Sequence, residues 1–574
     1  MTILLRWNAI AVVAIAAIGS LASPSRSAGA NLPEQVFAVT PGDETQDVIF
    51  LEVDRPVLLR LHIFSGDKGF RTAWEDHVER LRDFFDKNRD GKLAIGEFDA
   101  NLCAQLLASP FGQSTQLLGG IPQAFQIDVN PQDGFLSLAE LVDKIRPVFT
   151  SFLIEQNGSP NRREEEIFRR LDQNGDGKLS ANELDAAVAS LFALDEDDDE
   201  LLVASELDPN SNPLARRFFF RPPVQNNNNT FLIVDDRGMN DSTIAQLIAH
   251  YDQGGRRKNA DARDGKLARC EIGLDEATFL AADKNHDAKL EAGEIKTWLV
   301  GMRPEAEFRI DLPTGTGRTR IELLHGNGES IERNASPYVP AGQGNLQSGT
   351  ALHFVDSRVE VWPEPYVTGN LKQIYVSNIE NADGDQNGVF ERKEVEATFL
   401  GQYFDLLDRD GDGKIVLKDF ERLAEIQEES VGARCVLRIG DKGRSLFDVF
   451  DKNHDQILSV REIRDAKGAI LAFDRDGDRS VSSEEITRRF RLKLGRGNAG
   501  FFQQDPEDGD GNINVSPMMS SSIVEGAPWF HRMDRNADGD VSRREFLGTD
   551  ADFRLIDRDG DGLIDPKEAA AAPY

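Results

Sequence analysis

Residues 557–568 read DRDGDGLIDPKE, and this twelve-residue stretch decides how the rest of the chain is interpreted. Oxygen-bearing side chains occupy its positions 1, 3, 5, 9 and 12, and glycine occupies position 6. Aspartates on alternate residues repel one another, and each then resists ionisation, unless an opposite charge neutralises them. The spacing therefore predicts a bound hard cation.

The same pattern occurs at nine places along the chain. The loops cover residues 86–97, 172–183, 283–294, 383–394, 408–419, 451–462, 474–485, 534–545 and 557–568. Calcium prefers six to eight oxygen ligands, which side chains at positions 1, 3 and 5, a backbone carbonyl at position 7 and a bidentate Glu at position 12 supply. Position 8 is apolar in all nine loops, which predicts a buried residue whose backbone pairs with a partner loop.

The candidate metal ligands are the residues at positions 1, 3, 5, 7 and 12. In the first five loops they are Asp86, Asn88, Asp90, Lys92, Glu97, Asp172, Asn174, Asp176, Lys178, Glu183, Asp283, Asn285, Asp287, Lys289, Glu294, Asp383, Asp385, Asn387, Val389, Glu394, Asp408, Asp410, Asp412, Lys414 and Asp419. In the last four they are Asp451, Asn453, Asp455, Ile457, Glu462, Asp474, Asp476, Asp478, Ser480, Glu485, Asp534, Asn536, Asp538, Asp540, Glu545, Asp557, Asp559, Asp561, Leu563 and Glu568.

Several loops depart from this pattern. A tenth loop, 195–206, keeps the acids Asp195, Asp197, Asp199 and Glu206 but has Glu200 at position 6. Ala288, Gln456 and Arg479 replace the glycine at position 6, which favours a positive φ, so we expect weaker binding in their loops. Asp419 is one methylene shorter than Glu, which favours monodentate binding and Mg²⁺ as an alternative ion.

Three further segments are less complete. Residues 128–140 have one residue too many, and the stretch around Asp508 and Asp510 lacks an acid at position 12. Residues 252–271 look like an expanded loop, with Asp252 at position 1 and with Asp264 and Glu271 in the second half. Inserted basic residues at 256–258 argue against a metal there.

The pattern resembles the EF-hand superfamily of calcium-binding proteins in its ligand positions, its turn, its apolar position 8 and its flanking helical runs. Nine matches make a chance likeness negligible. The resemblance implies Ca²⁺ at multiple sites. With its closely spaced, paired short EF-hands behind a predicted N-terminal signal peptide, the chain resembles bacterial secreted EF-hand proteins.

Because EF-hands work in pairs, we expect the loops that begin at 86 and 128, 172 and 195, 264 and 283, 383 and 408, 451 and 474, and 534 and 557 to pair. About eleven residues separate most partners, and a continuous helix of that length would place the two loops about 16 Å apart. A break in the connection is therefore required, and Gly273, Gly401, Gly468 and Gly548 are the candidates. The 172/195 connection contains no such break.

Segments 47–64, 306–326, 351–362 and 433–443 alternate apolar residues and read as strands. We therefore expect an α+β fold, mainly α, in which a tandem array of about six pairs with short helices is separated by short β-strand segments. The expected organisation is a signal peptide (1–30), a β segment (31–75), loop pairs (76–150, 160–212, 243–302, 369–428 and 523–574), a strand plus loop pair (429–495), a strand or linker (213–242), a β-rich segment (303–368) and a degenerate loop or linker (496–522).

Composition narrows the choice of partners. The net charge of −33 argues against nucleic acid, which requires a basic surface. Arg6, an apolar run over 9–18 and a small-residue site at 28–30 predict a secretory signal peptide, so we expect a secreted or periplasmic protein with no transmembrane segment in the mature chain. Cys103, Cys270 and Cys435 are too far apart in the sequence for a disulfide framework or a zinc cluster.

We therefore expect a secreted, multi-site calcium-binding protein whose fold is stabilised by calcium. Its expected role is to buffer calcium or to support surface assembly. One alternative is a calcium sensor or adaptor that binds a protein or cell-surface partner, although the six Met residues are few for a sensor groove. A second alternative is an enzyme with a cryptic site in the β segments. The chain has no HExxH and no GxSxG motif, and we expect no enzyme activity.

Overall fold

The computed structural model describes residues 42–572 except 54, 108–120, 158–161, 208–229, 235–239, 253–262, 316, 327–330, 336–348, 355, 367–370, 397, 399, 409–410, 445, 454–456 and 498–526. The predicted signal peptide and the degenerate loop around Asp508 lie outside the described residues. Within the described part of the chain, no helix has the length and apolarity needed to cross a membrane.

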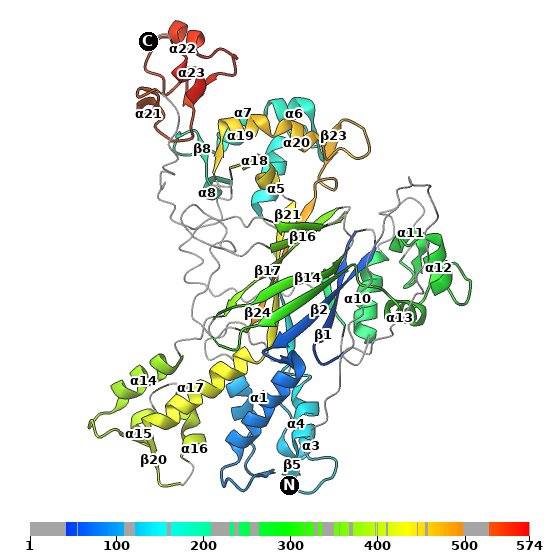
Figure 1. Ribbon diagram of the computed structural model, residues 1–574, viewed down its shortest axis with the longest axis vertical. Helices are drawn as coiled ribbons and strands as arrows, with labels where there is room; N and C mark the ends of the chain where they lie inside the picture. Colours follow the sequence, from blue (N-terminus) through cyan, green and yellow to red (C-terminus); the bar gives the residue numbers. More distant parts are fainter. Residues whose placement is uncertain are drawn as a thin grey trace, which may run out of the picture. The chain divides into compact units, whose positions relative to one another are not determined.

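The described strands include two six-stranded sheets, whose labelled strands can be followed in Figure 1. The first contains, in spatial order, β14 (Arg320–Gly326), β12 (Ala306–Leu312), β2 (Pro56–Ser65), β1 (Thr45–Leu51) and β9 (Phe231–Ile233), with β3 (Lys68–Gly69) paired to β2. The second contains β15 (Ile331–Ala335), β16 (Gly349–His353), β17 (Ser357–Pro363), β24 (Arg488–Arg496), β21 (Cys435–Arg444) and β6 (Phe152–Asn157). A short additional pair joins β13 (Gly317–Arg318) to β18 (Pro365–Tyr366).

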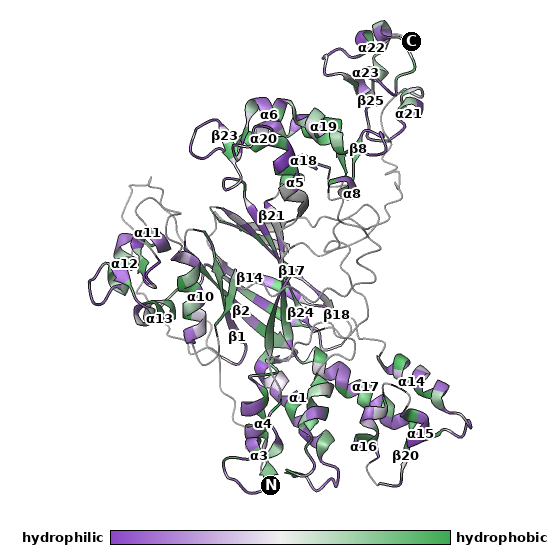
Figure 2. Ribbon diagram, turned by 180° about the vertical axis from the view of Figure 1, so that it is seen from behind, coloured by the Kyte–Doolittle hydropathy of each residue, from purple (hydrophilic) through white to green (hydrophobic). Residues whose placement is uncertain are grey.

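The apolar faces of the two sheets share one core. Phe50 of β1 stacks on Phe231 of β9 with ring centroids 4.7 Å apart, and it meets the edge of Phe490 of β24, in the other sheet, at 5.3 Å. One buried cluster contains side chains from β1, β2, β9 and β12 together with side chains from β17, β21 and β24. Figure 2 shows the apolar colouring of β1 and β2 at this core. The other face of the first sheet is also covered, because Ile49, Leu51 and Leu58 lie in a separate buried cluster with Leu247 and Ile295.

The expected fold class is therefore wrong. The structure has 39% helical and 25% strand residues, and the strand segments are not spacers between helical pairs. They come from distant parts of the chain and combine into the two sheets: the parallel pairing of β2 with β12, for example, joins Leu59 to Ala306. The strands predicted from alternation are present, but β6 and β24 were missed.

Short helices flank the metal-binding loops. They are α1 (Phe70–Phe85), α2 (Ala100–Leu107), α3 (Ala124–Ile127), α4 (Leu138–Ile145), α5 (Arg162–Leu171), α6 (Ala181–Asp185), α7 (Ala187–Leu191), η1 (Phe192–Leu194), α8 (Ala204–Leu207), α10 (Asp241–Tyr251), α11 (Arg269–Ile272), α12 (Glu276–Ala282), α13 (Ala292–Val300), α14 (Leu371–Ala382), α15 (Arg392–Val395), η2 (Gly401–Tyr403), α16 (Phe404–Leu407), α17 (Leu417–Gly432), α18 (Leu446–Phe450), α19 (Val460–Asp465), α20 (Lys467–Leu471), α21 (Phe530–Met533), α22 (Asp550–Ile556) and α23 (Pro566–Ala570).

The loops pair through two-stranded ribbons centred on position 8, as predicted. The ribbons are β4 (Leu93–Ala94) with β5 (Phe135–Leu136), β10 (Leu267–Ala268) with β11 (Lys289–Leu290), β19 (Val389–Glu391) with β20 (Lys414–Val416), β25 (Val541–Ser542) with β26 (Leu563–Ile564), β7 (Lys178–Ser180) with β23 (Ser480–Ser482), and β8 (Leu201–Leu202) with β22 (Leu458–Ser459). The first four ribbons join neighbouring loops in the sequence.

The last two ribbons correct the predicted pairing. The loop that begins at Asp172 pairs with the loop at Asp474, and the loop at Asp195 pairs with the loop at Asp451. Residues 162–207 and 446–486 thus form one crossed module, whose apolar side chains lie in a single buried cluster. Within neither segment do the two loops pair with each other.

The connections between loops explain this exchange. In the crossed module α6 runs almost directly into α7, and α19 into α20, so the two loops of each unit lie at opposite ends of a helical connection. Gly468 lies inside α20 and does not break it. In the locally paired loops, Gly273 ends α11 in the left-handed conformation with φ 60° and Asp275 caps α12. Thr549 caps α22 by accepting from Asp552 N.

The second sheet brings residues 162–207 and 446–486 close together. β6 and β21 are parallel neighbours, with Phe152 opposite Cys435 and Asn157 opposite Gly440. The chain therefore leaves both strands at the same end of the sheet, toward α5 and α18, which contact each other. Sheet pairing across more than 280 residues of sequence thereby decides which loops meet.

A second buried cluster joins the first and fourth loop pairs. It contains side chains from α1 and α4 together with side chains from α14, α16 and α17. His77 of α1 is fully buried beside Ser430 of α17, with Nε2 3.0 Å from Oγ. The Ser430 hydroxyl donates to the carbonyl of Ile426, so His77 Nε2 donates to Ser430 and Nδ1 is left as a buried acceptor with no partner. Burial, with a smaller contribution from the charge of Arg80, lowers the pKa of His77 to about 3.

This buried imidazole predicts acid sensitivity. The unfolded chain binds a proton at His77 below about pH 6.5 and the folded chain does not, so the free energy of unfolding falls between about pH 6.5 and 3, by up to about 1.4 kcal/mol per unit. In denaturant titrations with saturating calcium, we expect His77→Gln to lose less stability than wild type between about pH 7 and 5. The same substitution at the exposed His531 is the control, and an equal loss in all three proteins would contradict the prediction.

Candidate metal centres

The backbone of each loop holds its own acidic side chains in place. In the loop at Asp557, the Asp557 carboxylate accepts hydrogen bonds from Gly560 N (2.7 Å) and Gly562 N (3.1 Å). Asp559 accepts from Asp561 N at 3.1 Å, and Asp561 accepts from Leu563 N at 2.8 Å. The same contacts recur in the loops at Asp86 and Asp474. The backbone of the loop thereby holds both oxygens of Asp557 and one oxygen each of Asp559 and Asp561.

The position-12 glutamate links the loop to its exit helix. Glu568 Oε1 accepts from Arg558 N at 2.8 Å, and Oε2 accepts from Asp565 N at 3.1 Å. Asp565 in turn caps α23 by accepting from Glu568 N at 2.7 Å, and Pro566 stands at the start of the helix, where no N–H donor is required. The hydrogen bonds that begin the exit helix therefore also fix the side chain of Glu568, the last ligand of the loop.

Two positions take left-handed backbone in the regular loops whose positions 4 and 6 the structure describes. At position 6, Gly562 has φ 83°, and Ala288 and Arg479 adopt φ 64° and 72° in the loops that lack the glycine. Position 4 is left-handed as well, for example His286 with φ 59° and Gly560 with φ 74°, a requirement that the sequence analysis overlooked. The non-glycine residues hold the same loop conformation at a steric cost.

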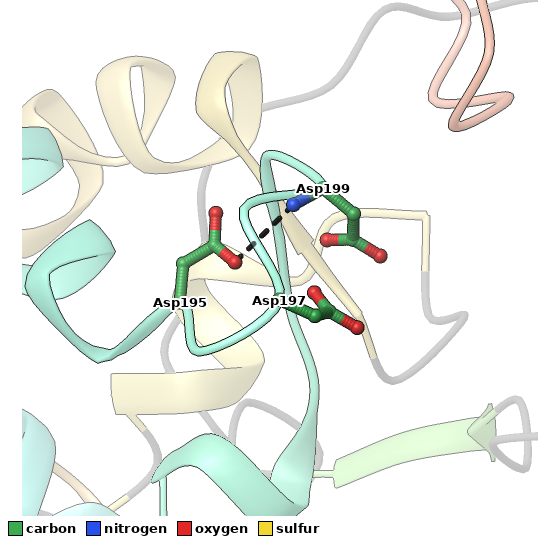
Figure 3. Close-up of side chains that lie close together, drawn as sticks. All are labelled: Asp195, Asp197 and Asp199. Carbon is green, nitrogen blue, oxygen red and sulfur yellow. Dashed lines mark hydrogen bonds between the residues drawn. The ribbon is translucent and has the colours of Figure 1, made fainter.

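Four loops gather carboxylate oxygens within 4.8 Å of one another. The groups are Asp195, Asp197 and Asp199; Asp383, Asp385 and Glu394; Asp474, Asp476 and Glu485; and Asp557, Asp559 and Glu568. Figure 3 shows the first of these, in which Asp199 N lies 3.3 Å from an oxygen of Asp195. Burial raises the pKa of Asp199, and the charges of Asp197 and Asp195 add to the shift.

Buried carboxylate oxygens without partners test whether a cation fits. Position-1 oxygens of Asp283, Asp408 and Asp534 are buried in the structure and accept no hydrogen bond. Such an oxygen is costly to bury unless a partner replaces the lost water, and a hard cation is a partner of the right charge. The residues present therefore fit calcium, which when bound would neutralise the carboxylates and link the loop to its exit helix.

In the loop at Asp534, burial and neighbouring acids both oppose the ionisation of Asp538. Burial, followed by the charges of Asp540, Asp534 and Glu545, raises the pKa of Asp538 to about 7. The arrangement is different at Glu140, where hydrogen bonds from Asn130 N, Ser137 and Val129 N outweigh burial and lower the pKa to about 2. A carboxylate like Asp538 needs a positive charge beside it to remain ionised at neutral pH.

Two of the loops whose sequences are less complete have the same backbone hydrogen bonds as the regular loops. In residues 128–140, Asp128 accepts from Gly134 N at 2.9 Å and Glu140 accepts from Val129 N at 3.0 Å, so the loop accommodates its extra residue. The sequence signal for this loop was its apolar Leu136, which pairs with Leu93, and its final acid Glu140. The expanded loop at Asp252 likewise pairs Leu267 with Leu290.

Lysines at position 7 cross to the partner loop in two ribbons. Lys178 pairs with Asp478 in the crossed module. Lys289 lies 2.5 Å from Asp264, and Lys266 lies 3.2 Å from Asp287. Each contact places a positive charge on the position-5 acid of the facing loop. Of the predicted ligands, Asp410 and Asp455 lie outside the described residues.

Comparison with protein families agrees with this geometry. The model of the EF hand matches four segments of the chain, residues 165–188, 400–424, 527–547 and 551–568. These matches, on loops with the geometry described above, support placing the chain among the EF-hand calcium-binding proteins. No solved structure matches the chain.

Proposed function

We propose that this chain is a secreted or periplasmic, multi-site calcium-binding protein whose fold calcium stabilises. The observation that carries the proposal is the set of buried, unpartnered carboxylate oxygens at position 1 of three loops, those of Asp283, Asp408 and Asp534. Each is an acceptor turned away from water, and in the loops at Asp283 and Asp534 the other acidic and amide side chains accept hydrogen bonds from the backbone of the loop. A hard dication satisfies these oxygens and the loop charges together.

Charge supports a structural role for the ion. Nine filled sites would add 18 positive charges to the formal −33, leaving about −15. The loops connect distant parts of the chain through the crossed module, so filling them stabilises contacts that are far apart in sequence. We propose calcium buffering or calcium-dependent surface assembly as the biological use, and a binding rather than a catalytic role. The leader-like residues 1–30 support secretion.

Isothermal titration of calcium into the chelator-stripped mature chain tests the proposal. We expect at least nine ions per chain, one for each strong loop, with affinities of about 10⁻⁴–10⁻³ M as in extracellular modules. Magnesium is expected to compete best at the loop that ends in Asp419. A titration that counts fewer than about five ions would contradict the multi-site proposal.

A further inference from the structure

The expanded loop between α10 and α11 closes in the same way as the regular loops. Gly265 N donates to Asp252 Oδ2 at 2.8 Å, and Lys266 N donates to Asp264 Oδ1 at 2.9 Å. Ala268 N donates to Glu271 Oε2 at 2.7 Å. These contacts reproduce those of positions 6, 7 and 9 in the loop at Asp86, at 2.9, 2.8 and 2.9 Å.

The backbone of this loop also has the regular conformation. Gly265 has φ 77°, close to the 80° of Gly91 at position 6 of the regular loop. Leu267 pairs with Leu290 of the neighbouring loop, and both side chains are fully buried. The insertion therefore separates position 1 from the rest of the loop in sequence but not in space, because Asp252 still accepts from Gly265 N.

Two of its carboxylates have buried oxygens with no partner. Asp252 is 6% exposed and Glu271 is 5% exposed. Asp252 Oδ1 and Glu271 Oε1 accept no hydrogen bond in the described structure. In the regular loop the corresponding Glu97 Oε1 accepts from Asn88 N at 3.3 Å. The expanded loop thus buries more uncompensated carboxylate oxygen than its regular counterpart does.

We propose that Asp252, Asp264 and Glu271 form a further calcium site, which replaces the prediction that the inserted basic residues exclude a metal. This inference rests on the proposed function, since it uses the same ion. The Lys266 carbonyl occupies the place of position 7 in this loop. A divalent cation supplies the partner that Asp252 Oδ1 and Glu271 Oε1 lack.

Lys289 supplies part of the compensating charge when no ion is bound. Its ammonium lies 2.5 Å from Asp264 Oδ2, whereas the unpartnered oxygens belong to Asp252 and Glu271. One lysine on one of three carboxylates leaves the two buried acids uncompensated. Calcium therefore has a place here that the lysine does not fill.

Counting bound ions on the full mature chain tests this site. In native mass spectrometry with calcium, we expect Glu271→Gln to bind one ion fewer than wild type. The matched control is Glu276→Gln, five residues away and exposed in the ion pair with Arg269, which keeps the wild-type count. Far-UV circular dichroism of each variant checks that it folds.

A second measurement needs no variant. Crystals of the wild-type chain grown with calcium chloride should show an anomalous difference peak between Asp252 Oδ1 and Glu271 Oε1. If wild type binds calcium but Glu271→Gln keeps the same count and no peak lies between these oxygens, this inference is wrong and the proposed function stands. If wild type binds no calcium, the proposed function and this inference both fail.

Discussion

Removing calcium with EGTA is expected to lower the midpoint of thermal unfolding by about 10 °C. If each of nine loops is filled at about ten times its dissociation constant, binding contributes about 1.4 kcal/mol per site and about 13 kcal/mol in total. Without the ion, acids such as Asp538, Asp534 and Glu545 repel one another inside a loop that partly buries them. Circular dichroism melts with and without chelator measure the shift.

The control for this melt is calcium added back beyond the chelator, which should restore the original midpoint. Magnesium at the same concentration should restore only part of it, because its octahedral geometry fits few of these loops. A midpoint that does not respond to EGTA would mean that the loops form without ions and that calcium is not linked to folding.

The loops themselves could be predicted from sequence because everything that defines them is local. Twelve consecutive residues fix the ligands of the loop at Asp557, and its apolar Ile564 at position 8 fixes the ribbon with Val541. Gly273 was likewise sufficient to predict a break between helices and hence a local pair. These features depend on turn and cap chemistry within a few residues.

The partners of the loops could not be predicted in the crossed module. Gly468 and Gly273 both lie in the connection between two loops. Gly273 has a positive φ and ends its helix, whereas Gly468 lies inside α20 without a positive φ. Which loop meets which depends on the parallel pairing of β6 with β21, more than 280 residues apart. Short alternating strands carry no signal for their distant neighbour.

The extent of the two packed sheets was also larger than predicted, for a related reason. β24 alternates Phe490, Leu492 and Leu494 with basic residues, and this period of two was visible in the sequence. Its position directly after a metal-binding loop made it look like the end of a helical pair. Alternation identifies a half-buried strand, but the number of strands that share a sheet becomes apparent only when all such segments are placed together.

Val481→Asp is expected to destabilise the whole crossed module. Val481 is fully buried at position 8 of its loop and lies opposite Leu179 in the ribbon of β7 and β23. An aspartate there would bury a charge with no partner, at a cost of at least about 4 kcal/mol. Because residues 162–207 and 446–486 share one core, the damage should reach both segments.

Hydrogen exchange followed by mass spectrometry distinguishes this outcome from local pairing. We expect amide protection to fall in both segments of the crossed module, while the ribbon of Val541 with Ile564, which has its own core, keeps its protection. Val416→Asp makes the same chemical change at a ribbon residue that is 44% exposed and should leave exchange unchanged. Loss of protection confined to residues 446–486 would show that the loops at Asp172 and Asp195 fold together without the second unit.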